Sequence, residues 1–136
     1  MKIMVCYNGS KAAQAALKLA HTHAKVWNST LAVIKAISRE LPLKHSYVRE
    51  AEQNLDDETK DLLDGDDASY ETLLLISSPT PGEQLVQFAE KRRFDQIFIG
   101  IERKSKVGKL LFGSTAQYVI LKAPCSVVTV QEKDAE

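Results

Sequence analysis

The sequence predicts an α/β fold, a single doubly wound sheet of five parallel strands with helices on both faces. Two observations support this prediction. Five short apolar runs recur along the 136 residues, and segments with helical spacing separate successive runs. Strands that alternate with helical crossovers form parallel sheets with helices packed against them. The length suits one compact unit, so residues 1–136 are expected to form a single domain.

The chain begins with an expected strand, a helix and a second strand. Residues 2–7 (KIMVCY) form a short apolar run that ends at a turn over residues 8–10 (NGS). Residues 11–26 carry alanines at helical spacing, which predicts a helix packed closely on the sheet. Residues 29–37 (STLAVIKAI) are apolar almost throughout, as expected of a parallel strand that is covered on both faces.

The middle of the chain is expected to be a linker, an acidic helix and a third strand. The linker spans residues 38–46, and the helix, over residues 47–63, has a thin apolar stripe among many carboxylates. Residues 69–77 (SYETLLLIS) form the third expected strand. The tetrapeptide TPGE at residues 80–83 combines a capping box with proline at the first helical position, and it predicts a helix that runs to Arg92.

The last third of the chain completes the pattern with two strands and one helix. Residues 94–100 (FDQIFIG) and 125–131 (CSVVTVQ) are the fourth and fifth expected strands, and residues 114–122 form the helix before the last strand. In such sheets, ligands bind beyond the carboxyl ends of the strands, where the strand order reverses. The loops that follow the first and fourth strands are therefore the candidate binding loops.

Composition excludes several classes of function. Lys and Arg together number 18, as do Asp and Glu, which argues against a general nucleic-acid-binding protein. Cys6 and Cys125 are the only cysteines, so a disulfide framework is not expected, and the chain is expected to be cytoplasmic. No apolar run approaches the roughly 20 residues of a membrane span. Both cysteines are expected to be small core residues.

The stretch IGIERKSKVGKLLFGST, residues 99–115, has the glycines and basic residues of a phosphate loop. It does not fit G-x-x-x-x-G-K-[ST], because the first glycine would fall on Arg103 and the Ser/Thr on Leu110. The dinucleotide pattern G-x-G-x-x-G is also absent. A different arrangement fits. Gly113 and Ser114 stand at the start of a helix, where backbone N–H groups attract anions, and Gly100 ends the preceding strand.

These residues resemble the universal stress protein family, which carries G-x2-G-x9-G-[ST] at this point. Gly100, position 103, Gly113 and Ser114 match its spacing without insertion. The segment IMVCYNGSKAAQAALKLA resembles the family's opening strand, turn and Ala-rich helix, and APCSVV at residues 123–128 resembles its last strand. The resemblance covers nearly the whole chain and is weakest over residues 38–68. It implies a Rossmann-like sheet, of the adenine nucleotide α-hydrolase-like type, with strand order 3-2-1-4-5.

The resemblance also implies a ligand, which is ATP or the related nucleotides ADP and AMP, with Mg²⁺ as a possible companion. The glycine-loop amides and the hydroxyl at the helix start would bind phosphate and ribose. The first turn and the residue that ends the second strand would lie near the adenosine. The implied binding residues are Asn8, Gly9, Ser10, Ala36, Gly100, Arg103, Gly113, Ser114 and Thr115.

Two residues depart from the family pattern. Arg103 replaces the second glycine, so its guanidinium either blocks the phosphate site or grips a phosphate itself. Asn8 replaces the acidic residue of the first turn, which keeps hydrogen bonding but loses the charge. The principal hypothesis is a cytoplasmic stress-response protein that binds an adenine nucleotide and signals through its bound state. The alternative is a dimeric protein-interaction module without nucleotide, in which both residues mark a decayed site.

The last expected strand also predicts a homodimer. Residues 125–131 carry little charge, and an unprotected edge strand tends to pair with another. Members of the family that the chain resembles commonly dimerise through this strand. An unidentified protein partner is expected as well, whereas nucleic acid and membrane are not.

No catalytic or metal site is expected. No nucleophile, base and orienting group can be assembled, so the chain is predicted not to be an enzyme beyond a weak ATPase activity. His21 and His23 point to different sides of a helix and His45 falls in the linker, so no metal site is expected. Ser114 also has a purely structural interpretation, as a helix N-cap with Gln117 closing a capping box.

Overall fold

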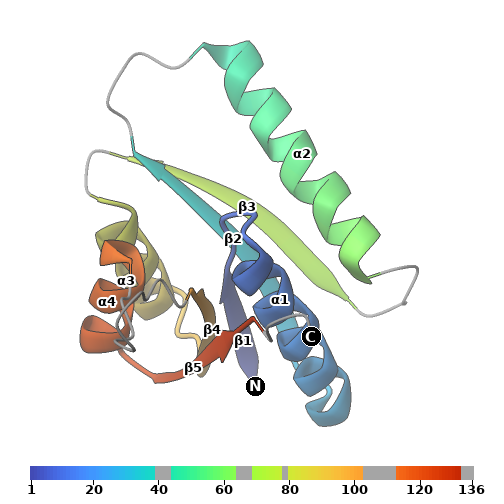
Figure 1. The fold of residues 1–136 in the computed structure, drawn as a ribbon, viewed down its shortest axis with the longest axis vertical. Helices are drawn as coiled ribbons and strands as arrows, with labels where there is room; N and C mark the ends of the chain where they lie inside the picture. The colour runs from blue at the N-terminus through green and yellow to red at the C-terminus, as the bar shows by residue number, and fades with distance from the viewer. Residues whose placement is uncertain (39–43, 64–68, 78–79, 103–112, 133–136) are drawn as a thin grey trace.

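The computed structural model describes residues 1–38, 44–63, 69–77, 80–102 and 113–132, and within them strands and helices alternate (Figure 1). The strands are β1 (Lys2–Cys6), β2 (Thr30–Ser38), β3 (Tyr70–Ser77), β4 (Gln96–Ile101) and β5 (Ser126–Gln131). The helices are α1 (Lys11–Trp27), α2 (His45–Leu63), α3 (Pro81–Lys91) and α4 (Ser114–Lys122). Every predicted element is present, with ends that differ from the prediction by one or two residues.

The five strands form one parallel sheet in the order β3-β2-β1-β4-β5, which confirms the predicted fold. The chain first moves outward from β1 through β2 to β3, and it then returns to the other side of β1 with β4 and β5. The strand order therefore reverses between β1 and β4. This reversal leaves a crevice at the carboxyl ends of the two strands, because the following loops and helices diverge to opposite faces of the sheet.

Two hydrophobic cores lie on opposite faces of the sheet. The first core packs Ile3 and Val5 of β1 against α1 and α2, and the second packs Met4 and Cys6 against α3 and α4. Figure 1 shows the same division, with α3 and α4 together on one side of the sheet and α1 and α2 on the other. Because neighbouring side chains of a strand point to opposite faces, a strand buried on both sides needs a continuous apolar run.

Capping explains where the helices begin and end. Ser10 caps α1, since its Oγ accepts a hydrogen bond from the backbone N–H of Ala13 at 3.1 Å. Asn28 ends the same helix in the left-handed region, with φ of 50°. The capping residue predicted for α3 is confirmed, because the Thr80 hydroxyl accepts from the N–H of Glu83 at 3.4 Å.

The acidic helix α2 differs from the prediction at its start. It begins at His45, so this residue belongs to the helix and not to the linker where it was expected. The helix contacts the rest of the protein mainly through its second half, where Leu55 and Leu63 are buried in the first core. None of the described helices is both long and apolar enough to cross a membrane.

Candidate functional site

A cavity of about 430 Å³ lies where the strand order reverses. The carboxyl ends of β1, β2 and β4 form its floor, and the first turns of α1, α3 and α4 form its walls. In a parallel sheet with helical crossovers, each helix that follows a strand begins at this same edge. The cavity therefore gathers three helix N-termini, whose partial positive charge favours an anionic ligand.

The structure brings together most of the residues predicted to bind a ligand. Seven of the nine line the cavity, namely Asn8, Ser10, Ala36, Gly100, Gly113, Ser114 and Thr115. Gly9 belongs to the same turn without lining the cavity, and Arg103 lies outside the described residues. Ala36 and Gly113 line the same cavity although 77 residues separate them in the sequence.

The turn after β1 is held by its own side chains. The Asn8 Oδ1 atom accepts a hydrogen bond from the N–H of Ser10 at 3.1 Å, and Gly9 adopts φ of +83°, which favours glycine. The Gln14 side chain donates to the Gly9 carbonyl at 3.2 Å. Because the Asn8 oxygen is engaged within the turn, the amide nitrogen is the end of this side chain that can donate to a ligand.

Gly100 has a packing role that differs from the predicted one. It lies within β4, one residue before the strand ends, and a Cβ atom there would stand 2.3 Å from the backbone carbon of Ala12 and 2.5 Å from the nitrogen of Ala13. The start of α1 therefore lies directly against the β4 backbone. Only glycine permits this approach, so a ligand is not needed to explain Gly100, although the residue also lines the cavity.

The start of α4 corrects the predicted role of Ser114 as an N-cap. Gly113 is the N-cap, with φ of −62° and ψ of 156°, and the Gln117 N–H bonds to its carbonyl at 2.9 Å. Since glycine has no side chain, no side-chain cap satisfies the first N–H groups of this helix. Ser114 and Thr115 are then the first two helical residues, and both line the cavity.

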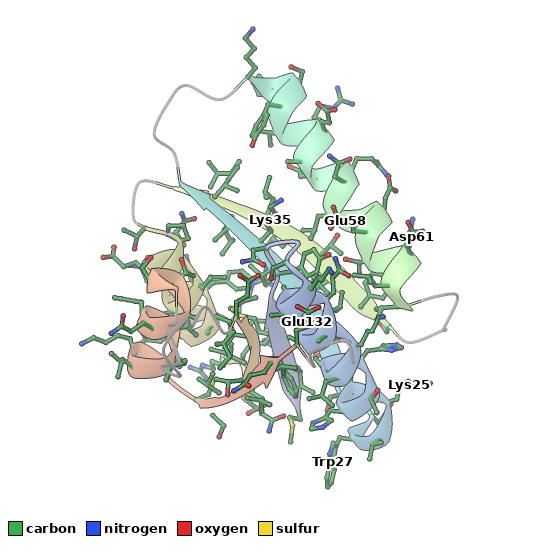
Figure 2. All side chains as sticks on the ribbon, viewed as in Figure 1. Lys25, Trp27, Lys35, Glu58, Asp61 and Glu132 are labelled. Atoms are coloured by element: carbon green, nitrogen blue, oxygen red, sulfur yellow. The ribbon has the colours of Figure 1, made fainter. Side chains whose placement is uncertain are left out.

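The thiol and the phenol beside the cavity are held in their neutral forms. Burial, with a smaller contribution from Cys125, raises the pKa of the Cys6 thiol to about 12, so this sulfur is a poor nucleophile at neutral pH. Burial and a hydrogen bond to Glu58 raise the pKa of Tyr7. The Tyr7 hydroxyl donates to the Glu58 carboxylate at 2.8 Å, and Figure 2 shows Glu58 on helix α2.

Sequence reasoning missed several lining residues. Glu102 follows β4 directly and is the only carboxylate among the described lining residues, and Pro81 and Leu85 reach the cavity from α3. Glu102 lies within the glycine-rich stretch, just beyond the end of a predicted strand. That position was the signal in the sequence that could have identified it as a lining residue. Across the described part of the chain, no group of three or more His, Cys, Asp or Glu residues is arranged to hold a metal ion.

The fold and the cavity define a class of protein, a small parallel α/β domain with an anion-attracting crevice where the strand order reverses. The particular family follows from comparison with known proteins. The model of the Universal stress protein family matches residues 1–131, so this chain belongs to that family.

Individual relatives agree with this assignment. A universal stress protein of Methanocaldococcus jannaschii is 38% identical over 56 residues, which are 41% of this chain and 33% of that protein. The chain thus matches only about one-third of that relative's length. A solved universal stress protein of Archaeoglobus fulgidus is 30% identical with a TM-score of 0.81, and the match covers 96% of this chain and 98% of the other.

Several structural relatives bind adenine nucleotides. A structure of the Archaeoglobus fulgidus universal stress protein in complex with dAMP is 25% identical, with a TM-score of 0.76 and coverage of 96% of this chain and 97% of the other. Two further universal stress proteins were solved with cAMP and with AMP, the latter from Arabidopsis thaliana. At 18% and 14% identity, they share the fold with this chain.

Proposed function

We propose that this protein binds ATP or a related adenine nucleotide in the cavity between β1 and β4, and that the bound state regulates its action in a stress response. One observation supports the proposal most directly. The uncapped start of α4, the turn after β1 and the end of β2 all line one cavity of about 430 Å³. This volume falls within the roughly 300–1,000 Å³ range of small-molecule sites. The dAMP complex of a relative supports the choice of ligand.

Each end of the nucleotide has a matching part of the cavity. The first N–H groups of α4, at Ser114 and Thr115, can donate to phosphate oxygens, and the helix dipole adds to this attraction. Ala36, which is half-buried, offers an apolar surface to a base. The side-chain amide of Asn8 can donate to a ribose or base acceptor.

We propose a binding function without efficient catalysis. Hydrolysis would require a group that positions or deprotonates water, and the Cys6 thiol is protonated at neutral pH. Glu102 is the carboxylate that could serve a slow ATPase. Phosphate release that is faster than in a protein-free control and that disappears in Glu102→Gln would contradict the non-catalytic assignment.

The test of nucleotide binding is calorimetric titration of ATP, ADP and AMP, each with and without Mg²⁺. The informative variant is Gly113→Ala, because a Cβ at this position meets no atom of the described residues within 4 Å and would act mainly on a bound ligand. Its matched control is Asn28→Gly, which changes the other end of α1, where φ of 50° accepts glycine and which does not line the cavity. We expect saturable binding that Gly113→Ala weakens and Asn28→Gly leaves unchanged.

Arg103 lies outside the described residues, and the same assay assigns its role. If Arg103→Ala abolishes binding, the arginine is a ligand to the nucleotide. If Arg103→Gly strengthens binding several-fold, the arginine obstructs a site that glycine opens. Absence of binding in folded, nucleotide-free protein would contradict the proposal.

The alternative is a protein-interaction module without nucleotide. Asn8 favours this alternative, because its uncharged side chain directs the oxygen back to Ser10. Under either proposal we place the protein in the cytoplasm as a homodimer that pairs through residues 125–131. In the described sheet β5 is an edge strand that pairs with β4 only. A monomeric mass at micromolar concentration would contradict the dimer.

A further inference from the structure

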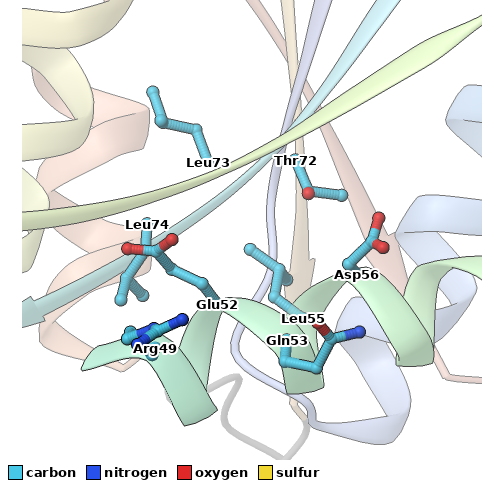
Figure 3. Close-up of a pocket in the computed structure, with 8 residues that line it drawn as sticks. All are labelled: Arg49, Glu52, Gln53, Leu55, Asp56, Thr72, Leu73 and Leu74. Atoms are coloured by element: carbon cyan, nitrogen blue, oxygen red, sulfur yellow. The ribbon is translucent and has the colours of Figure 1, made fainter. Parts of the chain in front are cut away.

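A second cavity, of about 400 Å³, lies between helix α2 and strand β3 (Figure 3). Among the described residues, none lines both this cavity and the one between β1 and β4. Helix α2 contributes residues from its first two-thirds, from Arg49 to Asp56, and β3 contributes Thr72, Leu73 and Leu74. We call this cavity the α2–β3 groove.

The groove runs along the free edge of β3. Thr72, Leu73 and Leu74 are consecutive, so their side chains alternate between the two faces of the sheet. Leu73 lines the groove even though its side chain packs against the core on the α3 side. Figure 3 shows the same arrangement, with the Leu73 side chain directed away from α2. Side chains on both faces of a strand can line one cavity only if that cavity follows the edge of the strand.

The strand edge offers backbone hydrogen bonds. β3 is the terminal strand of the sheet, and among the described residues it pairs with β2 alone. Alternate residues of such a strand direct their N–H and C=O groups away from the sheet, where an extended segment can pair with them. The segment from Leu73 to Ile76 is half-buried and apolar, and it has neither proline nor lysine to block this pairing.

The side chains of the groove select the charge of the occupant. Leu73 and Leu74 provide half-buried apolar surface. Glu52 and Asp56 stand one turn apart on α2, and Asp56 also pairs with Lys60 at 3.1 Å. Among the lining residues that the structure describes, Arg49 is the only basic one. Over its whole length, α2 carries six carboxylates against two basic side chains, Arg49 and Lys60. An occupant with basic side chains therefore complements this surface.

The same charge argues against a second copy of this chain as the occupant. Pairing of two β3 edges would bring two copies of the acidic helix α2 close together. Like charges across an interface disfavour the association. A cationic segment from a different protein gains the strand pairing without this repulsion.

We propose that the α2–β3 groove is a docking site for an extended segment of a partner protein that carries alternating basic and apolar side chains. The segment adds a strand to the β3 edge, so its alternate side chains face opposite sides of the sheet. The basic side chains lie on the α2 side beside Glu52 and Asp56, and the apolar side chains lie on the other side, where Leu73 is packed. Main-chain pairing supplies affinity and the side chains supply specificity, as in other cases of strand addition.

The test uses isotope-labelled protein of the full chain and three capped octapeptides. The first alternates Lys and Val, the second alternates Glu and Val, and the third is the Lys-Val peptide with alternate backbone nitrogens methylated, which removes half of its donors. We expect the Lys-Val peptide to shift the amide resonances of Thr72, Leu73 and Leu74 and of the facing turns of α2. The Glu-Val and methylated peptides should bind at least about fivefold more weakly.

Matched variants locate the binding site. The double variant Glu52→Gln, Asp56→Asn should weaken Lys-Val binding about fivefold, the effect expected for two partly exposed ion pairs. The control Glu50→Gln, Asp61→Asn removes the same charge from exposed α2 positions outside the groove, and it should change the affinity less than twofold. Equal effects of the two double variants, equal binding of all peptides, or shifts confined to β5 would overturn the proposal.

Discussion

Replacing Gly100 with alanine tests the close contact between α1 and β4. The added Cβ would stand 2.3 Å from the backbone carbon and 2.5 Å from the backbone oxygen of Ala12, where ordinary contacts are at least 3.4 Å. Because these atoms are backbone, no side-chain rotation relieves the contact, and α1 must move by about 1 Å. Overpacking of this kind costs about 3 kcal/mol, and the reduced entropy of the unfolded chain offsets about 0.7 kcal/mol.

We therefore expect Gly100→Ala to lower the free energy of unfolding by about 2 kcal/mol or more, measured by urea denaturation at an unchanged m-value. Gly113→Ala is the matched control, since its Cβ meets none of the atoms that the structure describes within 4 Å, and it should cost under about 1 kcal/mol through the helix cap. A Gly100→Ala protein within about 0.5 kcal/mol of the wild type would show that α1 is not held against the β4 backbone at this position. Any loss of nucleotide binding in this variant would reflect displacement of α1, because the substitution acts first on packing.

Two further predictions concern the groups beside the cavity. Tyr7→Phe removes the 2.8 Å hydrogen bond to Glu58 and should lower the free energy of unfolding by about 1 kcal/mol. Tyr47→Phe, at an exposed position, should change it by almost nothing. Equal costs for the two variants would contradict a stabilising role of the Tyr7–Glu58 hydrogen bond. Because the pKa of Cys6 rises from 9.0 to about 12 on folding, the unfolded thiol ionises first and stability falls as pH rises above about 9. The stability advantage of the wild type over Cys6→Ala should therefore shrink by about 1.4 kcal/mol between pH 7 and pH 10, and a constant difference in denaturation would exclude this effect.

The order of the elements and the type of sheet could be predicted from local patterns in the sequence. Apolar runs such as residues 2–7 and 29–37 identified buried strands, because a parallel strand has a core on each face. The capping residue Thr80 identified the start of α3, since a cap is a local interaction between neighbours in the chain. Strands alternating with helices then led to the correct parallel arrangement.

The candidate site was predicted only in part, because sequence patterns report interactions between neighbours in the chain. The residues of the first turn and of the glycine loop are recognisable locally, and the topology brings strand ends to a common edge. The sequence did not indicate that Glu102 and Pro81 line the same cavity. It also assigned the N-cap of α4 to Ser114, because a glycine cap leaves no side-chain signal.

The remaining roles come from contacts between segments that are distant in the sequence. Gly100 is required by a backbone contact with Ala12, which lies 88 residues earlier in the chain. The hydrogen bond from Tyr7 to Glu58 and the α2–β3 groove likewise join segments that no local pattern relates. Such contacts depend on how closely α1 and α2 approach the sheet, and that distance is set by the packing of the whole core, which periodicity and capping do not encode.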